Sequence, residues 1–229
     1  MECAEDRAVV VAIDGPAGVG KSTVARRSAQ EAGFLYINSG NFYRAITLAV
    51  LDSGTAPYDT ASVVALARRV RLDLGPGGVE LDGCLVEDRL HADAVDRWVA
   101  PLSAIAEVRD IVNRRIRDIA SRVDSVVEGR DIGTVVFPRA DVKIFLDADV
   151  ATRAGRRHVQ GTSALTREEI QRTIQERDRL DRNKPGGPLT AALDAVRIDT
   201  SLLTIQQVCE RVQKAILVSK NNPGDIRGL

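Results

Sequence analysis

Short apolar runs along the chain alternate with longer stretches in which apolar residues recur every three or four positions. The apolar runs are short enough to be buried strands and cover residues 9–13, 34–37, 125–127, 142–146 and 196–199. The longer stretches have the spacing of helices that bury one face. Because strands and helices alternate, the sequence predicts an α/β fold, a parallel sheet core with helices on both faces.

Residues at the ends of the helical stretches indicate where the helices begin and stop. Gly33 has the position of a left-handed residue that ends a helix. Thr166 and Glu169 have the spacing of a capping box, and Thr204 and Gln207 repeat it. The predicted helices cover 21–32, 41–52, a stretch from 60, 108–119, 150–159 and two stretches that begin after the capping threonines.

The pattern changes to short alternating segments at about residue 70. Residues 70–74 and 79–81 alternate in polarity around a turn that contains Gly75, Pro76, Gly77 and Gly78, which is typical of a β-hairpin. We therefore expect residues 1–58 and 108–229 to form a core domain. Residues 59–107 are expected to form a small antiparallel insertion within it.

The first strand is followed by a phosphate-binding motif. Residues 15–22 fit G-x-x-x-x-G-K-[ST], between a strand and a helix as the motif requires. Backbone N–H groups of such a loop point at phosphates, the helix N-terminus adds positive potential, and Lys21 reaches the outer phosphates. The Ser22 hydroxyl is placed to hold Mg²⁺. The sequence thus predicts a nucleoside triphosphate site; a chance glycine turn is the alternative.

Polar residues that follow the other strands are expected to meet at the same sheet edge. Arg44 comes about one helical turn after Ser39, and a helix N-terminus with an arginine suits a phosphate group. Arg130 and Asp131 follow the strand at 125–127 directly. A surface arginine for Arg44 and a structural ion pair for Arg130 and Asp131 are the alternatives.

A charged stripe is predicted on the helix after Thr166. Ile170, Ile174, Arg177, Asp181 and Lys184 lie on one face at helical spacing, apolar first and charged afterwards. Either the charged end faces a cleft or the helix runs off the core into water. Arginines are dense from 153 to 184, which indicates either a solvated face or a lid that brings cations to a transferring phosphoryl group.

Composition narrows the partners and the compartment. The chain has 32 basic and 32 acidic residues and a formal net charge of zero, which argues against nucleic acid or an anionic membrane as a partner. The three cysteines show no metal or redox spacing. We read no signal peptide and no membrane span in the sequence. The expectation is a cytoplasmic protein, taken to be a monomer, that binds small molecules.

Taken together, the motifs resemble those of bacterial cytidylate kinases, in the nucleoside monophosphate kinase family. The resemblance runs from about Val9 to Gln213. It is carried by the loop at 13–23, Ser39-Gly40-x-x-Tyr43-Arg44, the segments at 128–138 and 143–148, Glu176-Arg177-Asp178-x-x-Asp181, and the segment at 198–201. It implies a P-loop kinase that transfers the γ-phosphoryl group of ATP to CMP or dCMP, with 59–107 as the monophosphate-binding insertion and 153–168 as the lid.

The resemblance also implies residue roles. On the ATP side these fall to Gly15, Gly18, Val19, Gly20, Lys21, Ser22 and Thr23, with Mg²⁺ on Ser22 and with Arg153 and Arg157 as lid arginines. On the acceptor side they fall to Ser39, Arg44, Arg109, Arg130, Asp131, Arg177 and Asp181, of which Arg109 and Asp131 read the cytosine edge. Lys21, Arg130, Arg177, Asp181 and Lys184 are the expected catalytic set.

Departures from the family pattern lie on the acceptor side. Lys184 replaces an arginine and loses its bidentate fork; Ala100 stands where the family has Ser or Thr; His91, Asn38 and Asn41 are also unusual. A modified cytidylate, or another small phosphate-ester or alcohol acceptor, is therefore an alternative substrate. Two further alternatives are a GTPase-like switch, against which the missing N-K-x-D motif argues, and a nucleotide-binding protein without catalysis.

Overall fold

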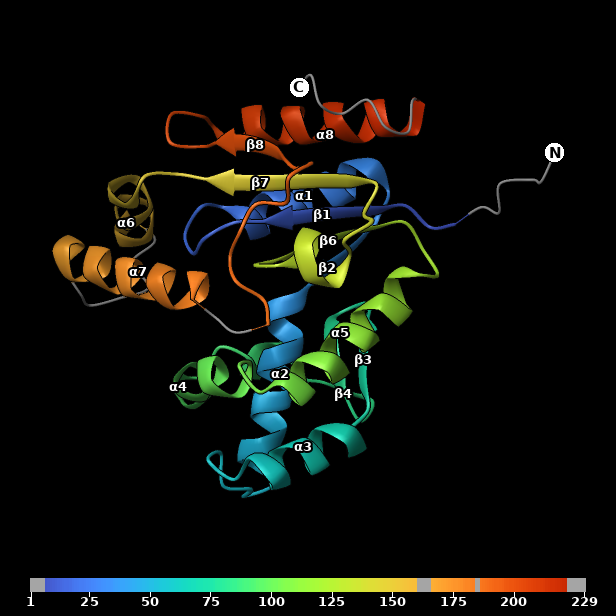
Figure 1. Cartoon of the computed structure of the whole chain (residues 1–229), viewed down its shortest axis with the longest axis vertical. Coiled ribbons are helices and arrows are strands. Elements are labelled where there is room, and N and C mark those ends of the chain that lie inside the picture. The colour runs from blue at the N-terminus through green and yellow to red at the C-terminus, as the bar shows by residue number, and fades with distance from the viewer. Residues whose placement is uncertain (1–6, 160–165, 184–185, 222–229) are drawn as a thin grey trace. The chain divides into compact units, whose positions relative to one another are not determined.

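The computed structural model describes residues 7–159, 166–183 and 186–221 (Figure 1). The chain divides into two compact units. The first unit contains the residues up to Ile37 and those from Val123 onward, and the second contains Asn38–Arg122. Each unit has its own sheet, so the two are described separately.

A five-stranded sheet forms the centre of the first unit. Its strands lie in the order β2 (Leu35–Asn38), β6 (Ser125–Gly129), β1 (Val10–Asp14), β7 (Val142–Asp147) and β8 (Val196–Asp199). β1 pairs in parallel with β6 and with β7, and β7 pairs in parallel with β8. The predicted strands are confirmed. Because β1 has strands from later in the chain on both sides, the carboxyl ends around it are where ligands bind in such sheets.

Among the described residues, four α-helices belong to the first unit. They are α1 (Lys21–Ala32), α6 (Val150–Val159), α7 (Arg167–Arg182) and α8 (Ile205–Asn221). α1 and α8 pack against the sheet. α1 and α8 pack against each other (Figure 1) and bury a core with Ile13, Ile144 and Val212. Gly33 ends α1 in the left-handed conformation, and Thr166 and Glu169 form both bonds of the predicted capping box.

The second unit surrounds a small antiparallel sheet. The predicted hairpin is present as β3 (Leu72–Gly75) and β4 (Gly78–Leu81), to which β5 (Cys84–Leu85) adds a third strand. The helices are α2 (Ser39–Asp52), α3 (Thr60–Arg69), α4 (Asp93–Leu102) and α5 (Ala106–Ala120), with a 3₁₀ turn η1 (Glu87–Arg89). The unit extends beyond the expected insertion at 59–107, because α2 contacts α3 and α4, and α5 contacts α3 and β3.

Two local features differ from the sequence reading. Pro101 predicts a break in the helix, since proline lacks the N–H that would bond to the preceding turn, but α4 continues past it to Leu102. A short π-helical segment, η2 (Ile132–Val136), follows β6 and was not predicted. Its backbone is held from outside the segment by a buried carboxylate, which a local pattern cannot reveal.

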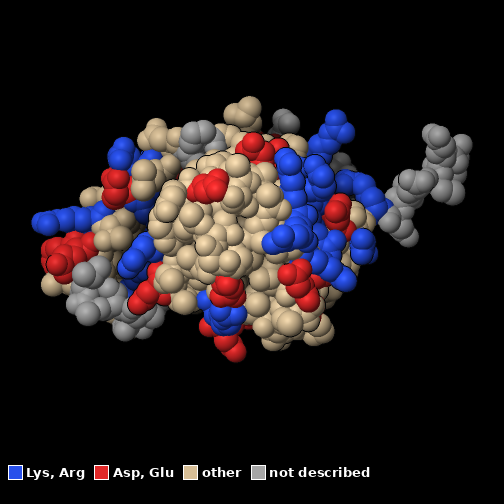
Figure 2. Space-filling view, turned by 90° about the horizontal axis from the view of Figure 1, so that it is seen from below, with Lys and Arg blue, Asp and Glu red and all other residues tan. Residues whose placement is uncertain are grey.

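Charge is unevenly spread over the surface. Figure 2 shows acidic and basic side chains on the same face, with Lys and Arg on both sides of it and more densely on one. The chain as a whole is balanced, so the accumulation is local. The absence of a nucleic-acid partner stays a prediction. Within the described residues, no helix combines the length and hydropathy that crossing a bilayer requires, and Cys84 and Cys209 are free thiols.

Gly15 is required by the close approach of two strands. Its φ is +151°, and a Cβ placed there would lie 2.2 Å from the carbonyl oxygen of Leu146. We expect Gly15→Ala to lower the free energy of unfolding by about 3 kcal/mol or more, because backbone strain and a clash with main chain act together. Urea denaturation measures the change.

Gly33→Ala is the matched control for this substitution. Its φ is also positive, at +70°, but a Cβ there would meet nothing within 4 Å. We expect a loss of about 1–2 kcal/mol from the left-handed conformation alone. Equal losses for the two variants would contradict the role assigned to the contact with Leu146.

Candidate active site

The phosphate loop joins β1 to α1, as the sequence predicts. Gly20 precedes α1 in the left-handed conformation, and Lys21 begins the helix. The side chain of Lys21 is buried, and its Nζ donates to the carbonyl oxygen of Pro16 at 2.7 Å. Burial, and then the positive charge of Arg130, lower the pKa of Lys21 well below its usual value. An anionic phosphate would therefore be strongly favoured beside this ammonium.

A carboxylate lies beside the predicted metal-binding hydroxyl. Ser22 Oγ donates to Oε2 of Glu128 at 3.0 Å, and the Tyr36 hydroxyl donates to the other carboxylate oxygen. Glu128 is buried near the carboxyl end of β6. Sequence reasoning did not select Glu128, although its position at the end of a strand beside β1 was a usable signal. A hydroxyl and a carboxylate are the oxygen ligands that Mg²⁺ prefers.

Mg²⁺ commonly takes its remaining ligands from water and substrate phosphates rather than from a protein cage. Within the described residues, no group of three or more His, Cys, Asp or Glu side chains could hold a metal ion.

Arg130 and Asp181 are brought together from distant parts of the chain. Arg130, directly after β6, places its Nε 2.8 Å from Oδ2 of Asp181 on α7. Arg130 therefore forms an ion pair with a residue that the sequence did not indicate as its partner, and its role in the site stays a prediction. The charge of Arg177, also on α7, contributes to the lowered pKa of Lys21. Two cations of the expected catalytic set thus act electrostatically on the phosphate-loop lysine.

Asp14 connects the start of the phosphate loop to the segment that carries Asp131. Its two carboxylate oxygens accept hydrogen bonds from the N–H groups of Ile132 at 2.8 Å and Gly133 at 2.7 Å. Burial raises the pKa of Asp14 to about 6, against the effect of these bonds. Since the folded pKa is raised, this group favours the folded state most below pH 3.8 and loses that contribution as pH rises through about 6.

The arginines of α6 differ in their surroundings. Arg153 is buried; it bonds to the carbonyl oxygens of Ala17 and Ala148 and forms an ion pair with Asp178. Arg157 is exposed near the end of α6. Residues 160–165 of the expected lid and Lys184 lie outside the described residues.

The predicted acceptor residues of the second unit lie on α2 and α5. Arg44 on α2 pairs with Asp96 of α4 at 2.6 Å and donates to the carbonyl oxygen of Leu90 at 2.9 Å. Arg109 on α5 is buried, with its guanidinium carbon 5.8 Å from the centre of the Tyr43 ring. Ser39 is buried as the first residue of α2.

One unusual residue on the acceptor side has a structural partner. The Nδ2 of Asn41 donates to Oε1 of Glu87 at 2.6 Å, and the other oxygen of Glu87 accepts from the N–H of Val79 at 3.1 Å. Asn41 therefore connects α2 to the small sheet of its unit. Although asparagine at this position departs from the family pattern, its amide has a hydrogen-bond partner within the chain.

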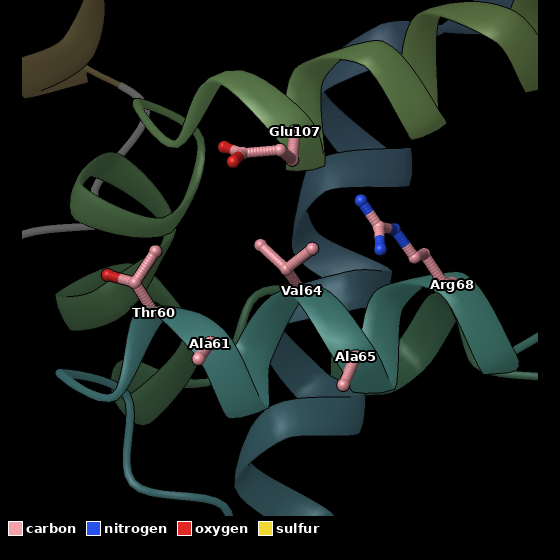
Figure 3. A pocket seen from close by; sticks show the side chains of 6 residues that line it. All are labelled: Thr60, Ala61, Val64, Ala65, Arg68 and Glu107. Carbon is pink, nitrogen blue, oxygen red and sulfur yellow. The ribbon is translucent and has the colours of Figure 1, made fainter.

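A hollow of about 490 Å³ lies elsewhere in the second unit, between α3 and α5 (Figure 3). Figure 3 shows Val64 of α3 pointing toward α5, with the Glu107 carboxylate on one side of it and Arg68 on the other. It is lined by Thr60, Ala61, Val64, Ala65, Arg68 and Glu107. None of these is a predicted site residue.

The sequence matches a known protein family and several of its members. A family model described as cytidylate kinase matches residues 11–217. A cytidylate kinase of Caldanaerobacter subterraneus is 42% identical over 221 residues, covering 95% of this chain and 98% of its own. One of Nocardia farcinica is 41% identical, covering 93% and 95%, and one of Limosilactobacillus reuteri is 40% identical, covering 90% and 94%.

A solved structure shows a similar fold at low identity. The crystal structure of an uncharacterized protein from Eubacterium ventriosum has a TM-score of 0.50 and 11% identity, covering 91% of this chain and 98% of that one. It supports the fold alone.

The family match spans nearly all of the described residues, including the phosphate loop, the 128–138 segment and α7. The chain belongs to the cytidylate kinase family.

Proposed function

We propose that the protein transfers the γ-phosphoryl group of ATP to CMP or dCMP, giving ADP and CDP or dCDP. The observation that carries the proposal is the cationic grouping at the phosphate loop, where Lys21 is buried at the start of α1 and Arg130, which follows β6, is held by Asp181 of α7. The positive charges of Arg130 and Arg177 contribute to the lowered pKa of Lys21. Such a grouping suits a transfer in which negative charge spreads over the oxygens of the moving group. The family membership supplies the acceptor, since the relatives bear the name cytidylate kinase.

On the donor side, the loop residues 15–23 are our candidates for the ATP phosphates. Lys21 would hold the outer phosphates and Ser22 would hold Mg²⁺, with Glu128 orienting the Ser22 hydroxyl. When bound, Mg²⁺ neutralises charge on the β- and γ-phosphates. Arg157 is the candidate for a lid arginine that contacts ATP.

On the acceptor side, the candidates come from each unit. Ser39, Arg44 and Arg109 of the second unit bind the monophosphate or its base; in the first unit Arg130 and Arg177 bind phosphate, and Asp131 and Asp181 orient base and ribose. An oxygen of the monophosphate attacks the γ-phosphorus while the bond to the β–γ bridging oxygen breaks. A phosphate dianion is already deprotonated, so positioning and charge neutralisation carry the reaction. Lys184 stays a candidate cation.

Glu128→Gln is expected to raise the Mg²⁺ concentration needed for half-maximal activity by about 10–100-fold, because outer partners of metal ligands have effects of this size. The amide keeps one oxygen for a hydrogen bond but loses the negative charge. Mg²⁺ titration at saturating ATP measures the change. Tyr36→Phe, which removes only the other bond to Glu128, should leave the Mg²⁺ requirement nearly unchanged; equal shifts would contradict the proposed metal role.

Asp131→Ala is expected to reduce discrimination between CMP and UMP by about tenfold or more while ATP binding changes little, because a hydrogen-bonding contact to the base supplies specificity. The ratio of kcat/KM for the two monophosphates, with a separate ATP titration, makes the comparison. Parallel losses in both measurements would argue against base recognition by Asp131.

A modified cytidylate is the second candidate acceptor. It is favoured by Ala100 and His91, which are exposed in the second unit and depart from the family pattern. ADP production with CMP, dCMP, UMP and AMP distinguishes the candidates. Efficient turnover of CMP excludes the modified acceptor, and absence of ADP with every monophosphate favours binding without catalysis. The cytoplasmic location and the monomeric state stay predictions.

A further inference from the structure

A buried arginine holds three segments of the first unit together. Arg153 is 2% exposed, and Asp178, its ion-pair partner, is 5% exposed. Nη1 and Nη2 of Arg153 bond to the two Asp178 carboxylate oxygens at 3.0 and 2.6 Å. Nη1 also donates to the carbonyl oxygen of Ala17 at 3.1 Å, and Nε donates to that of Ala148 at 3.0 Å. One guanidinium therefore joins the phosphate loop, the start of α6, and α7.

The bond to Ala17 holds the outer side of the phosphate loop. A loop that turns its N–H groups toward phosphates must direct carbonyl groups elsewhere. The Ala17 carbonyl is bound by Arg153, and the Val19 carbonyl accepts from Oγ1 of Thr200 at 3.4 Å. Arg156 bonds in turn to Thr200 Oγ1 at 3.0 Å. α6 lies against the loop here, since a Cβ placed on Gly18 would be 3.5 Å from that of Arg153.

The bond to Asp178 sets the rotation of α7. Asp178 follows Arg177 directly and precedes Asp181 by one turn, and Asp181 pairs with Arg130. α6 and α7 also pack side by side (Figure 1) through Ala154, Ile170 and Ile174. An apolar pair at 153 and 178 could fill the same space. Buried ion pairs are weak evidence for stability and can instead fix a single register.

We propose that Arg153 and Asp178 form a positioning pair that keeps the phosphate loop and α7 in the register needed for phosphoryl transfer. The expected effect of the pair on turnover rests on the proposed function. Its expected effect on the phosphate loop concerns ATP binding and does not depend on the acceptor. Four of the five N–H donors of Arg153 are already used within the chain. Arg153 thus acts through protein contacts, which separates it from the exposed Arg157.

The test compares Arg153→Met, Asp178→Leu and the double variant that carries both changes. Each single variant leaves a buried charge without its partner and should lower Tm, whereas the double variant should recover most of the Tm. We expect ATP affinity, measured by calorimetry without any acceptor, to fall about tenfold in all three proteins. Each of them lacks the ion pair that fixes the position of α7 relative to the phosphate loop. kcat with CMP should fall by a similar or larger factor.

The outcomes separate the explanations. A double variant that recovers both Tm and ATP affinity would show a purely structural pair and overturn the proposal. Loss of ATP affinity in Arg153→Met but not in Asp178→Leu would show direct contact with ATP and also overturn it. Arg153→Lys keeps the charge and loses the bidentate fork, so its ATP affinity should lie between those of Arg153→Met and wild type. Arg179→Met, which breaks the exposed pair with Glu176 on the same helix, should match wild type in ATP affinity.

Failure of the proposed function gives a different result. If the wild-type chain does not phosphorylate CMP, the ATP affinities and Tm values still test the positioning pair by themselves. If CMP is phosphorylated but the double variant binds ATP and turns over like wild type, the positioning pair alone is wrong.

Discussion

Replacing Lys21 with alanine is expected to lower kcat by about 10³-fold or more, because removal of a single preorganised donor to a developing charge already costs about 10²–10³-fold. Lys21 supplies both the donor and the charge that the loop directs at the phosphates. Its buried ammonium is disfavoured without a phosphate, as the lowered pKa shows, so the variant should retain or raise its Tm. Steady-state ADP production and thermal unfolding measure the two effects.

Lys143→Ala is a matched control for this change. Lys143 is buried to a similar degree, at 7% exposed against 6% for Lys21, and its Nζ also donates to the carbonyl oxygen of a proline five residues earlier at 2.7 Å. It pairs with Asp194 rather than facing the loop. We expect this variant to lose stability and keep most of its kcat. A Lys21→Ala enzyme that remains active would refute the assignment of the loop.

Arg130→Met is expected to lower kcat/KM for CMP by about 10²–10³-fold, because a guanidinium that binds phosphate oxygens supplies both charge and a bidentate fork. Its ion pair with Asp181 holds the side chain, which is 27% exposed, in one orientation before the substrate binds. The kcat/KM of Arg130→Lys should lie between those of Arg130→Met and wild type, since lysine keeps the charge without the bidentate fork. Initial rates over a range of CMP concentrations give the values.

Arg197→Met provides the control, because Arg197 is exposed on β8 and has no assigned role. It should leave kcat/KM unchanged. A loss of less than about fivefold in Arg130→Met would argue that the ion pair with Asp181 is only structural, since truncation of a charged hydrogen-bonding partner usually costs more.

The sequence was sufficient for the sheet, because short apolar runs bounded by turns report buried parallel strands directly. It was sufficient for α1 and α7 as well, since Gly33 and the Thr166 capping box are local signals. It gave the phosphate loop for the same reason. The extent of the second unit could not be predicted from the sequence, because the packing of α2 and α5 with α3 depends on contacts between distant residues.

The residues that support the site were harder to select. Glu128 and Asp14 look like ordinary strand-end acids until their partners Ser22 and Gly133 are known, 106 and 119 residues away. The charged stripe on α7 was likewise ambiguous, and the ion pair of Asp181 with Arg130 shows that this part of the stripe contacts the segment that follows β6. Arg153 matched a lid motif by position, and nothing local in the sequence indicates its bonds to Ala17 and Asp178.

The most direct test of the proposed transfer is to follow the phosphorus spectrum of the protein mixed with Mg·ATP and CMP. The account predicts that CDP and ADP appear in equal amounts, and that neither forms with Lys21→Ala. ADP without CDP would mean hydrolysis rather than transfer, and an unchanged spectrum would mean that CMP is not the acceptor; either result would contradict the account.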